Sequence, residues 1–369
     1  MSDPTGTPLG KLLDLHGAEL EHANRYLVSQ VVGEGGMAKV LHAWDAHLRR
    51  NVAVKVMTSA TGDDDRKRFN REARVLASLR HPGVVQLVDY SGPDAQRQYL
   101  VMELLEGQTL TVHVARKPLP EPALTALAYL LIEALRPAHE SGIVHRDIKP
   151  DNVFLEPGGR VVLIDFGLAK GTLLTAKRNT FLAGATKMLG TPEYSCPEVL
   201  ASAPLVVQSD FFSLGSTLYF AATGAPPFQS EKILELVNMI VSKPHVPLAQ
   251  KGFGAELSAV IDAMLQKGPD DRPASAKALL AMLEPLLKRT GNISPQQAIA
   301  EYLGTANDTV ITRAPPTRVG GKEEIGQVPR PGATATDGPA IASRVGPALI
   351  GAGVGVADGD LTALMAAKH

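Results

Sequence analysis

The sequence predicts an α+β fold in two lobes: a small antiparallel, strand-rich N-terminal lobe and a larger, mostly helical C-terminal lobe, with a cleft between them. Short Val- and Leu-rich runs separated by Gly-rich or polar turns occupy the first hundred residues, whereas apolar stretches with helical spacing dominate residues 121–287. The chain has 369 residues and 44% hydrophobic content, which is enough for a sizeable core and excludes a wholly disordered protein.

The N-terminal lobe is predicted to hold five strands and one helix. Asp63, Asp64 and Asp65 supply acidic residues and a cap for the helix, in which Phe69 and Leu76 fall at helical spacing. His81-Pro82-Gly83 ends that helix. The strands are expected at Tyr26–Val32, Lys39–Trp44, Asn51–Met57, Val84–Tyr90 and Gln98–Glu103.

The C-terminal lobe is predicted to begin with a long helix. Pro122 suits its first turn, and an apolar stretch runs from Glu121 to Gly142. Pro137 lies inside this stretch, where a proline costs about 3 kcal/mol and kinks the axis. Further helices are expected at Asp210–Thr223, Ser230–Ser242, Ala255–Gln266 and Ser275–Leu287.

Charge and cysteine content limit the partners of the chain. The formal charge of −1 provides no global positive field, so we expect no nucleic acid among its partners. The single cysteine, Cys196, excludes intrachain disulfides and a Cys-rich zinc site and fits a reducing compartment. The apolar run from Val345 to Ala357 is shorter than the ~20 residues of a membrane span, so we expect a soluble, cytoplasmic protein with no membrane span.

The composition changes near residue 290. Gly and Pro become more frequent from Gly291 onward, and no aromatic residue follows Gly304. Such a segment cannot offset its own ordering entropy. We therefore expect an N-terminal flank (1–23), a folded domain (24–288, with lobes at about 24–103 and 107–288) and a disordered tail (289–369).

A glycine-rich turn joins the first two predicted strands. Gly33, Gly35 and Gly36 precede Val40 without an intervening helix. That context argues against a dinucleotide fold, whose glycines open a helix, and favours a hairpin whose backbone N–H groups approach phosphates. Taken alone, the motif also fits a purely structural turn.

Lys55 lies inside the apolar strand that follows. A buried ammonium is costly unless it is paired, and Glu72 on the predicted helix is the obvious partner. The alternatives are a lysine that reaches solvent from an edge strand and a solvated helix glutamate.

Two polar clusters have the most specific spacing. His145-Arg146-Asp147-Ile148-Lys149-Pro150-Asp151-Asn152 precedes a short strand, and thirteen residues after Asn152 comes Asp165-Phe166-Gly167. A carboxylate and a carboxamide suit Mg²⁺, which prefers hard oxygen ligands and shares them with substrate phosphates. The joint spacing makes a chance match negligible.

With these motifs the chain resembles the eukaryotic-like (Hanks-type) serine/threonine protein kinases, most closely their bacterial members, over about residues 24–288. The resemblance implies the bilobal protein-kinase fold and ATP with Mg²⁺ as cofactors, with Mn²⁺ as a substitute. It also implies transfer of the γ-phosphate to Ser/Thr hydroxyls of protein substrates. Lys149 together with Thr191 points to serine/threonine specificity.

The resemblance also implies a role for each matching residue. Asp147 would orient the acceptor hydroxyl, Lys149 would neutralise the γ-phosphate, and Lys55, paired with Glu72, would contact the α- and β-phosphates. Asn152 and Asp165 would be the metal ligands. Met102 would be the gatekeeper, and the backbone of Glu103 and Leu105 would bind adenine. The expected nucleotide site comprises Val32, Gly33, Glu34, Gly35, Gly36, Val40, Ala53, Lys55, Met102, Glu103, Leu105 and Phe154.

Residues 190–198 resemble the end of a kinase activation segment. Thr186 is the first candidate for autophosphorylation, followed by Thr180 and Thr175, and Thr191 belongs to the same segment. A phosphate there could dock on Arg146 and order the loop. Autophosphorylation in trans implies a transient homodimer. The resemblance further implies a structural ion pair between Glu198 and Arg272 and an anchor for the catalytic loop at Asp210.

Three alternatives stay open. A pseudokinase would bind nucleotide without transfer, but its usual mark is the loss of Lys55, Asp147 or Asp165, and all three are present. A small-molecule kinase is the second, against which Lys149 and residues 190–198 argue. In the third the tail is functional: phosphates on Thr309, Thr312 and Thr317, near Arg313 and Arg318, would bind a phosphothreonine-reading partner. An inert linker is the favoured interpretation of the tail.

Overall fold

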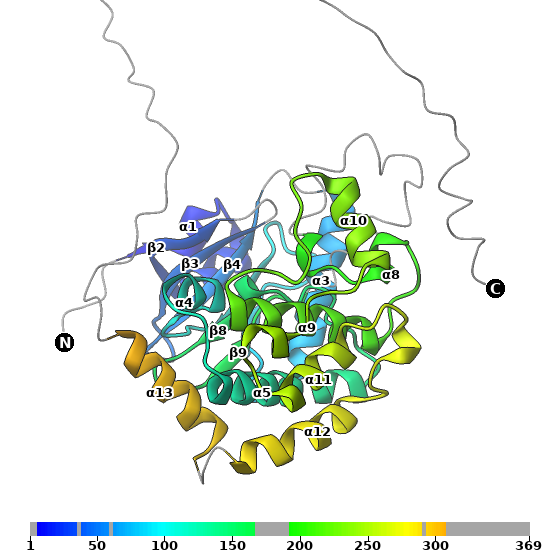
Figure 1. The fold of residues 1–369 in the computed structure, drawn as a ribbon. Helices are drawn as coiled ribbons and strands as arrows, with labels where there is room; N and C mark the ends of the chain where they lie inside the picture. The colour runs from blue at the N-terminus through cyan, green and yellow to red at the C-terminus, as the bar shows by residue number, and fades with distance from the viewer. Residues whose placement is uncertain (1–5, 35–37, 59–61, 167–191, 290–292, 308–369) are drawn as a thin grey trace, which may run out of the picture. The chain divides into compact units, whose positions relative to one another are not determined.

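The N-terminal lobe is built on a six-stranded antiparallel sheet with the strand order β1-β2-β3-β4-β6-β5. The computed structural model describes residues 6–34, 38–58, 62–166, 192–289 and 293–307 (Figure 1), and these lie in one compact unit, residues 1–312. The strands are β1 (Thr7–Pro8), β2 (Tyr26–Glu34), β3 (Ala38–Asp45), β4 (Arg50–Met57), β5 (Leu87–Tyr90) and β6 (Tyr99–Glu103).

The strand register places the residues of the predicted nucleotide site opposite one another. Across β4 and β6, Ala53 pairs with Met102 and Lys55 with Leu100. The predicted strands are confirmed, except that the fourth begins only at Leu87. Val84, which was predicted to lie in that strand, instead forms a bridge with Leu163 of the C-terminal lobe.

The two faces of the sheet are covered by different helices. On one face, helix α3 (Asp63–Ser78) packs Phe69 and Ala73 against Met57 and Leu100. The other face carries Val52, Val54 and Val56 of β4, whose alternation fixes the side on which they lie. Residues from α1 (Leu9–Leu12) and α2 (Gly17–Ala23), together with Leu15, pack in the same cluster. Residues 7–23, expected as a flank, are thus part of the lobe.

Helices make up most of the C-terminal lobe, as predicted. Between them lies a three-stranded antiparallel sheet of β7 (Gln108–Thr109), β8 (Val153–Leu155) and β9 (Val161–Leu163). The helices are α4 (Leu110–Arg116), α5 (Glu121–Glu140), α8 (Pro197–Leu200), α9 (Val207–Thr223), α10 (Ile233–Ser242), α11 (Ala255–Met264), α12 (Ala276–Arg289) and α13 (Pro295–Asn307).

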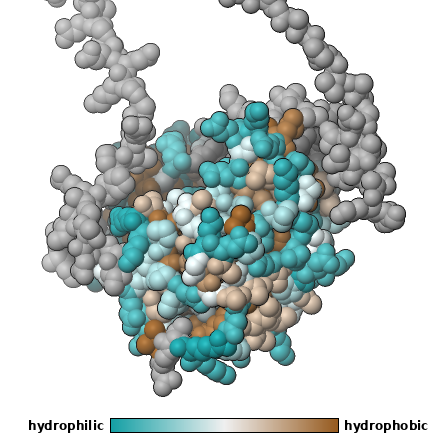
Figure 2. Space-filling model, in the orientation of Figure 1, coloured by the Kyte–Doolittle hydropathy of each residue, from teal (hydrophilic) through white to brown (hydrophobic). Residues whose placement is uncertain are grey.

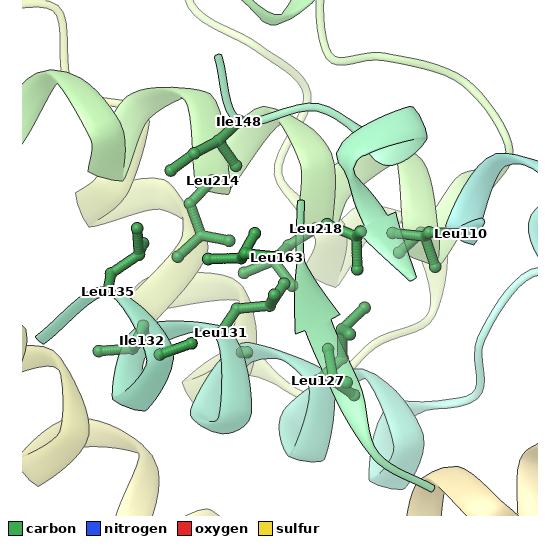
Figure 3. Packing of buried hydrophobic residues seen from close by; sticks show 14 of the residues in the cluster. Leu110, Leu127, Leu131, Ile132, Leu135, Ile148, Leu163, Leu214 and Leu218 are labelled. Carbon is green, nitrogen blue, oxygen red and sulfur yellow. The ribbon is translucent and has the colours of Figure 1, made fainter. Parts of the chain in front are cut away.

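The hydrophobic core of this lobe is centred on α5 and α9. Leu131 of α5, Leu163 of β9 and Leu214 of α9 are fully buried and converge in one cluster (Figure 3). α5 continues past Pro137 for three residues, so the proline falls in its last turn. This core holds α5 and β8–β9 in place on either side of the loop that carries Asp147.

Helix α13 corrects the expected start of the tail. Residues 289–369 were predicted to be disordered, but Pro295–Asn307 form a helix in contact with α5. Ile299, Tyr302 and Leu303 are buried in the C-terminal core, and the Tyr302 hydroxyl donates to the carbonyl of Lys117. Aromatic and aliphatic side chains at helical spacing outweigh the Gly- and Pro-rich composition that follows them. Residues 308–369 lie outside the described part of the chain.

Few large hydrophobic side chains are exposed on the described part of the surface. On the face in Figure 2, hydrophobic side chains are scattered among hydrophilic ones. Within the described part of the chain, no helix is both long and apolar enough to cross a membrane. The large hydrophobic residues that are exposed there are Leu12, Val31, Val32, Leu48, Val206, Leu234, Val246 and Met282.

Candidate active site

The glycine-rich turn is a hairpin between β2 and β3, as its sequence context predicts. Gly33 and Glu34 end β2, and Gly33 pairs with Val40 of β3. A Cβ at Gly33 would meet Val40 at an ordinary 3.8 Å, so packing alone does not require glycine there. Val32 is half-exposed beside it. Gly35 and Gly36 lie outside the described residues.

Lys55 joins three elements through one ammonium group. Its Nζ lies 2.7 Å from Oε1 of Glu72 on α3 and 2.6 Å from Oδ1 of Asp165, which follows β9. Burial alone would lower the pKa of Lys55, but the two carboxylates raise it above its ordinary value, so the ammonium stays charged. Burial raises the pKa of Glu72, although Lys55 opposes that shift. The side chain of Asp165 is 45% exposed and therefore open to solvent.

The loop that carries Asp147 is held by Asp210 at the start of α9. Its Oδ2 accepts the backbone N–H of His145 at 2.7 Å, and its Oδ1 accepts that of Arg146 at 2.9 Å. His139 contacts the same carboxylate at 2.8 Å. Arg146 has a φ of +72° and Asp165 a φ of +55°, values that non-glycine residues rarely adopt and that cluster at functional sites.

The polar groups of the loop converge on Asp147. Asn152 donates through Nδ2 to the backbone carbonyl of Asp147 at 2.8 Å and to its Oδ2 at 3.1 Å. Nζ of Lys149 lies 3.5 Å from the same Oδ2. His145 is fully buried, which lowers its pKa, and its ring lies 4.3 Å from that of Phe166. The neutral imidazole thus packs the loop against the Asp165-Phe166 pair.

The donor set fits a magnesium ion shared with a nucleotide. Because Nδ2 of Asn152 is bonded to Asp147, its side-chain oxygen is the atom that a cation would use, and Asp165 adds a solvent-accessible carboxylate. The backbone N–H of Ile164 donates to the carbonyl of Asn152 at 3.0 Å, which ties the two ligand segments together. Within the described ranges, no group of three or more His, Cys, Asp or Glu side chains could hold a metal ion. A magnesium ion here would therefore also need oxygen ligands from the nucleotide phosphates.

The residues expected around adenine lie on β3, β4, β6 and β8, except Leu105, which follows β6. Ala53 and Met102 are neighbours across the sheet and are nearly buried, whereas Val40, Leu105 and Phe154 are half-buried. The N–H of Glu103 donates to the carbonyl of Gln86 at 3.0 Å, so only its carbonyl can serve a ligand. Ala53 and Met102 thus lie two positions from Lys55 and Leu100 on the paired strands β4 and β6.

The predicted structural pair is a buried salt bridge. Nη1 of Arg272 lies 2.6 Å from Oε1 of Glu198, and Arg272 also donates to the carbonyls of Gln208, Gln266 and Lys267. The four threonines proposed for the activation segment, Thr175, Thr180, Thr186 and Thr191, lie outside the described residues.

Two arginines near the site escape prediction from the sequence. Arg160, in the turn between β8 and β9, donates four hydrogen bonds, of which two go to Glu103. Arg71 on α3 is close enough to Arg146 that, together with burial, it lowers the pKa of Arg146. Neither arginine lies in a recognisable motif, because each interacts with a residue that is distant in the chain.

Comparison with known proteins places this geometry in a family. Residues 26–282 match the protein kinase domain. The DNA damage-responsive serine/threonine-protein kinase RqkA of Deinococcus radiodurans is 37% identical over 84% of this chain and 46% of its own length. PknB of Mycolicibacterium smegmatis is 33% identical over 84% of this chain and 50% of its own length. A serine/threonine-protein kinase of Myxococcus xanthus is 33% identical, over 71% and 50% respectively.

The chain therefore spans about half the length of these curated relatives. The family match covers both lobes and every catalytic motif found in the sequence. On this basis the chain belongs to the protein kinase family, and the relatives it matches are bacterial serine/threonine kinases.

Proposed function

We propose that this chain is a serine/threonine protein kinase that transfers the γ-phosphate of Mg-ATP to Ser/Thr hydroxyls of proteins. The observation that carries the proposal is the position of Lys55, whose Nζ lies 2.7 Å from Glu72 and 2.6 Å from Asp165. One cation thus links strand, helix and metal-ligand segment, as phosphoryl transfer requires. A pseudokinase usually lacks Lys55, Asp147 or Asp165, whereas this chain has all three and brings Lys55 into contact with Asp165.

Phosphoryl transfer asks the protein mainly for positioning and charge stabilisation. Asp147 would accept a hydrogen bond from the acceptor hydroxyl and take its proton, held in place by Asn152 at 3.1 Å. Lys149, 3.5 Å from Asp147, would stabilise charge on the transferred phosphoryl group. Magnesium, held by Asn152 and Asp165, would neutralise the nucleotide phosphates when bound. Mn²⁺, which takes the same oxygen ligands, is the expected substitute.

The activation segment is the proposed point of control. Nε of Arg146 is buried without a hydrogen-bond partner among the described residues, and Arg71 adds positive charge near it. A phosphate on Thr186, or on Thr180 or Thr175, would offer both arginines an acceptor and order the segment. Autophosphorylation between two copies of the chain in a transient homodimer would supply this phosphate. We also propose that phosphates on Thr309, Thr312 and Thr317 would bind a phosphothreonine-reading partner. The proposed location of the chain is the cytoplasm.

The test is transfer from γ-labelled ATP to the chain itself and to a mixture of proteins, followed by phosphoamino-acid analysis. We expect phosphoserine and phosphothreonine with Mg²⁺ or Mn²⁺, and no label after chelation of the metal. Asp165→Asn should abolish transfer. Binding of ATP with no transfer by the unmodified chain, under conditions that also supply a phosphorylated activation segment, would favour the pseudokinase. Phosphotyrosine alone would refute the proposed acceptor class.

A further inference from the structure

Arg160 lies in the tight turn that joins β8 to β9. The turn is closed by the N–H of Glu156, which donates to the carbonyl of Arg160 at 2.9 Å, and by that of Gly159, which donates to the carbonyl of Glu156 at 2.8 Å. This hairpin connects Asn152, just before β8, with Asp165, just after β9. A side chain in the turn is therefore fixed relative to both proposed metal ligands.

From this turn the guanidinium of Arg160 reaches the other lobe. Nη1 and Nη2 donate to the two carboxylate oxygens of Glu103 at 2.9 and 2.7 Å, a bidentate pair. Nε donates to the carbonyl of Pro82 at 2.7 Å, and Nη1 also donates to Glu156 at 3.3 Å. Oε1 of Glu103 accepts the N–H of Gln86 at 2.9 Å as well. Charge-assisted bidentate pairs of this kind fix geometry more strongly than single contacts do.

The same hairpin holds the far end of the segment that links the lobes. We call residues 103–107 the hinge segment. Oε1 of Glu156 accepts the N–H of Glu106 at 3.0 Å. Gly107 has a φ of +152°, and a Cβ there would lie 2.1 Å from the carbonyl oxygen of Leu155. The hinge segment is thus fastened at both ends to β8–β9, by Arg160 at Glu103 and by Glu156 at Glu106.

We propose that Arg160 is a positioning residue of the nucleotide site. It fixes the backbone of the hinge segment, which would contact the 6-amino edge of adenine, relative to the β8–β9 hairpin, which connects the two proposed metal ligands. The inference rests on the proposed function, because it takes the backbone of Glu103 and Leu105 as the adenine contact. Arg160 touches no reacting atom. Its loss should weaken recognition of the base and leave the chemical step intact.

The experiment measures binding of Mg-ATP and Mg-ITP to the full chain by equilibrium titration, together with kcat and KM for ATP. In ITP an oxygen replaces the 6-amino group and N1 carries a hydrogen, so the ratio of the two affinities reports the hinge contacts to this edge of the base. Arg160→Met should weaken ATP binding about five- to tenfold, since it breaks one bidentate charged pair. It should change ITP binding and kcat less than about twofold. Arg160→Lys keeps the positive charge but cannot form the bidentate pair. It should restore part of the preference for ATP over ITP.

Two further variants isolate the effect. Arg289→Met breaks another bidentate arginine–glutamate pair, with Glu256, at the far end of α12, and should leave both affinities unchanged. Glu103→Gln should weaken ATP binding, and adding it to Arg160→Met should cause little further loss, because the two residues act as one unit.

Equal losses for both nucleotides, no loss for either, or an unmodified chain that does not distinguish ATP from ITP would each overturn the proposal. The binding titration does not need phosphate transfer. If the unmodified chain binds ATP selectively but transfers no phosphate, the proposed activity fails while Arg160 is still judged by the affinity ratio.

Discussion

Nζ of Lys55 lies 2.7 Å from Oε1 of Glu72, which joins the middle of β4 to helix α3. Both side chains are nearly buried, at 13% and 10% exposure, and each charge offsets the cost of burying the other. The pair therefore ties the position of α3 to the lysine that contacts Asp165.

Replacing this lysine should stop the reaction. Lys55→Met removes the cation that would contact the phosphates and leaves Glu72 and Asp165 without their shared partner. The initial rate of phosphate transfer should fall about 100-fold or more, as when a preorganised transition-state donor is removed. Lys67→Met is the matched control, because Lys67 lies on α3 with 78% exposure, 3.9 Å from Asp64. A Lys55→Met rate close to that of the control would contradict the role of the lysine.

The buried pair of Arg272 and Glu198 should stabilise the C-terminal lobe. Arg272→Met leaves the carboxylate of Glu198, which is 7% exposed, without its cation. We expect a loss of about 3–5 kcal/mol in the free energy of unfolding, measured with urea. Adding Glu198→Leu should recover part of it, since an apolar pair no longer buries a lone charge. If the single variant is as stable as the unmodified chain, the pair does not have this role.

His113 should make the fold acid-sensitive. Its ring is buried beside Tyr302 of α13, both nitrogens lack a hydrogen-bond partner among the described residues, and burial, with Arg116 nearby, lowers its pKa to about 4. As the pH falls below 6.5, the unfolded chain takes up this proton before the folded chain does. The stability contribution is therefore present above pH 6.5 and is lost as the pH falls towards 4.

The comparison variant is His113→Phe, which keeps a ring in the site. Between pH 7 and pH 5 the unmodified chain should lose about 2 kcal/mol more of its unfolding free energy than this variant does. Urea unfolding of both proteins at pH 7 and at pH 5 measures this difference. The same pH dependence in both proteins would show that other groups cause the acid sensitivity.

Gly159 should be required for the docking of α13. A Cβ at Gly159 would lie 1.8 Å from the carbonyl oxygen of Gln296, whereas at Gly142 it would meet nothing within 4 Å. Both glycines have positive φ, +81° and +70°. Gly142→Ala should therefore cost only the conformational penalty of about 1–2 kcal/mol, and Gly159→Ala clearly more. Limited proteolysis should also release α13 faster in Gly159→Ala. Equal behaviour of the two variants would mean that α13 does not depend on this contact.

Much of the active site could be predicted because its signals are local. The spacing of Asp147, Asn152 and Asp165 marks two strand ends, and a lysine inside an apolar strand demands an acidic partner, which the structure supplies as Glu72. The order of strands and helices follows equally from period-2 and period-3.6 patterns.

The rest could not be predicted for two reasons. Leu9 and Leu15 precede β2 with no pattern of their own, and they are needed only because Val52, Val54 and Val56 bury a whole sheet face. Arg160 sits in a glycine turn and meets Glu103 across 57 residues of chain, which no periodicity encodes. α13 is different. Ile299, Tyr302 and Leu303 do have helical spacing, and the composition of the following segment outweighed that signal in the prediction.

The central claim, phosphate transfer through Asp147, is tested most directly by the initial rate of transfer from γ-labelled Mg-ATP. Asp147→Asn should lower it about 10²–10⁴-fold, since the amide cannot take the proton of the acceptor hydroxyl. Asp151→Asn alters a neighbouring aspartate that is exposed and accepts a hydrogen bond from Thr111 at 3.0 Å, and it should leave the rate within about twofold. Transfer by Asp147→Asn at the rate of the Asp151 variant would contradict the account.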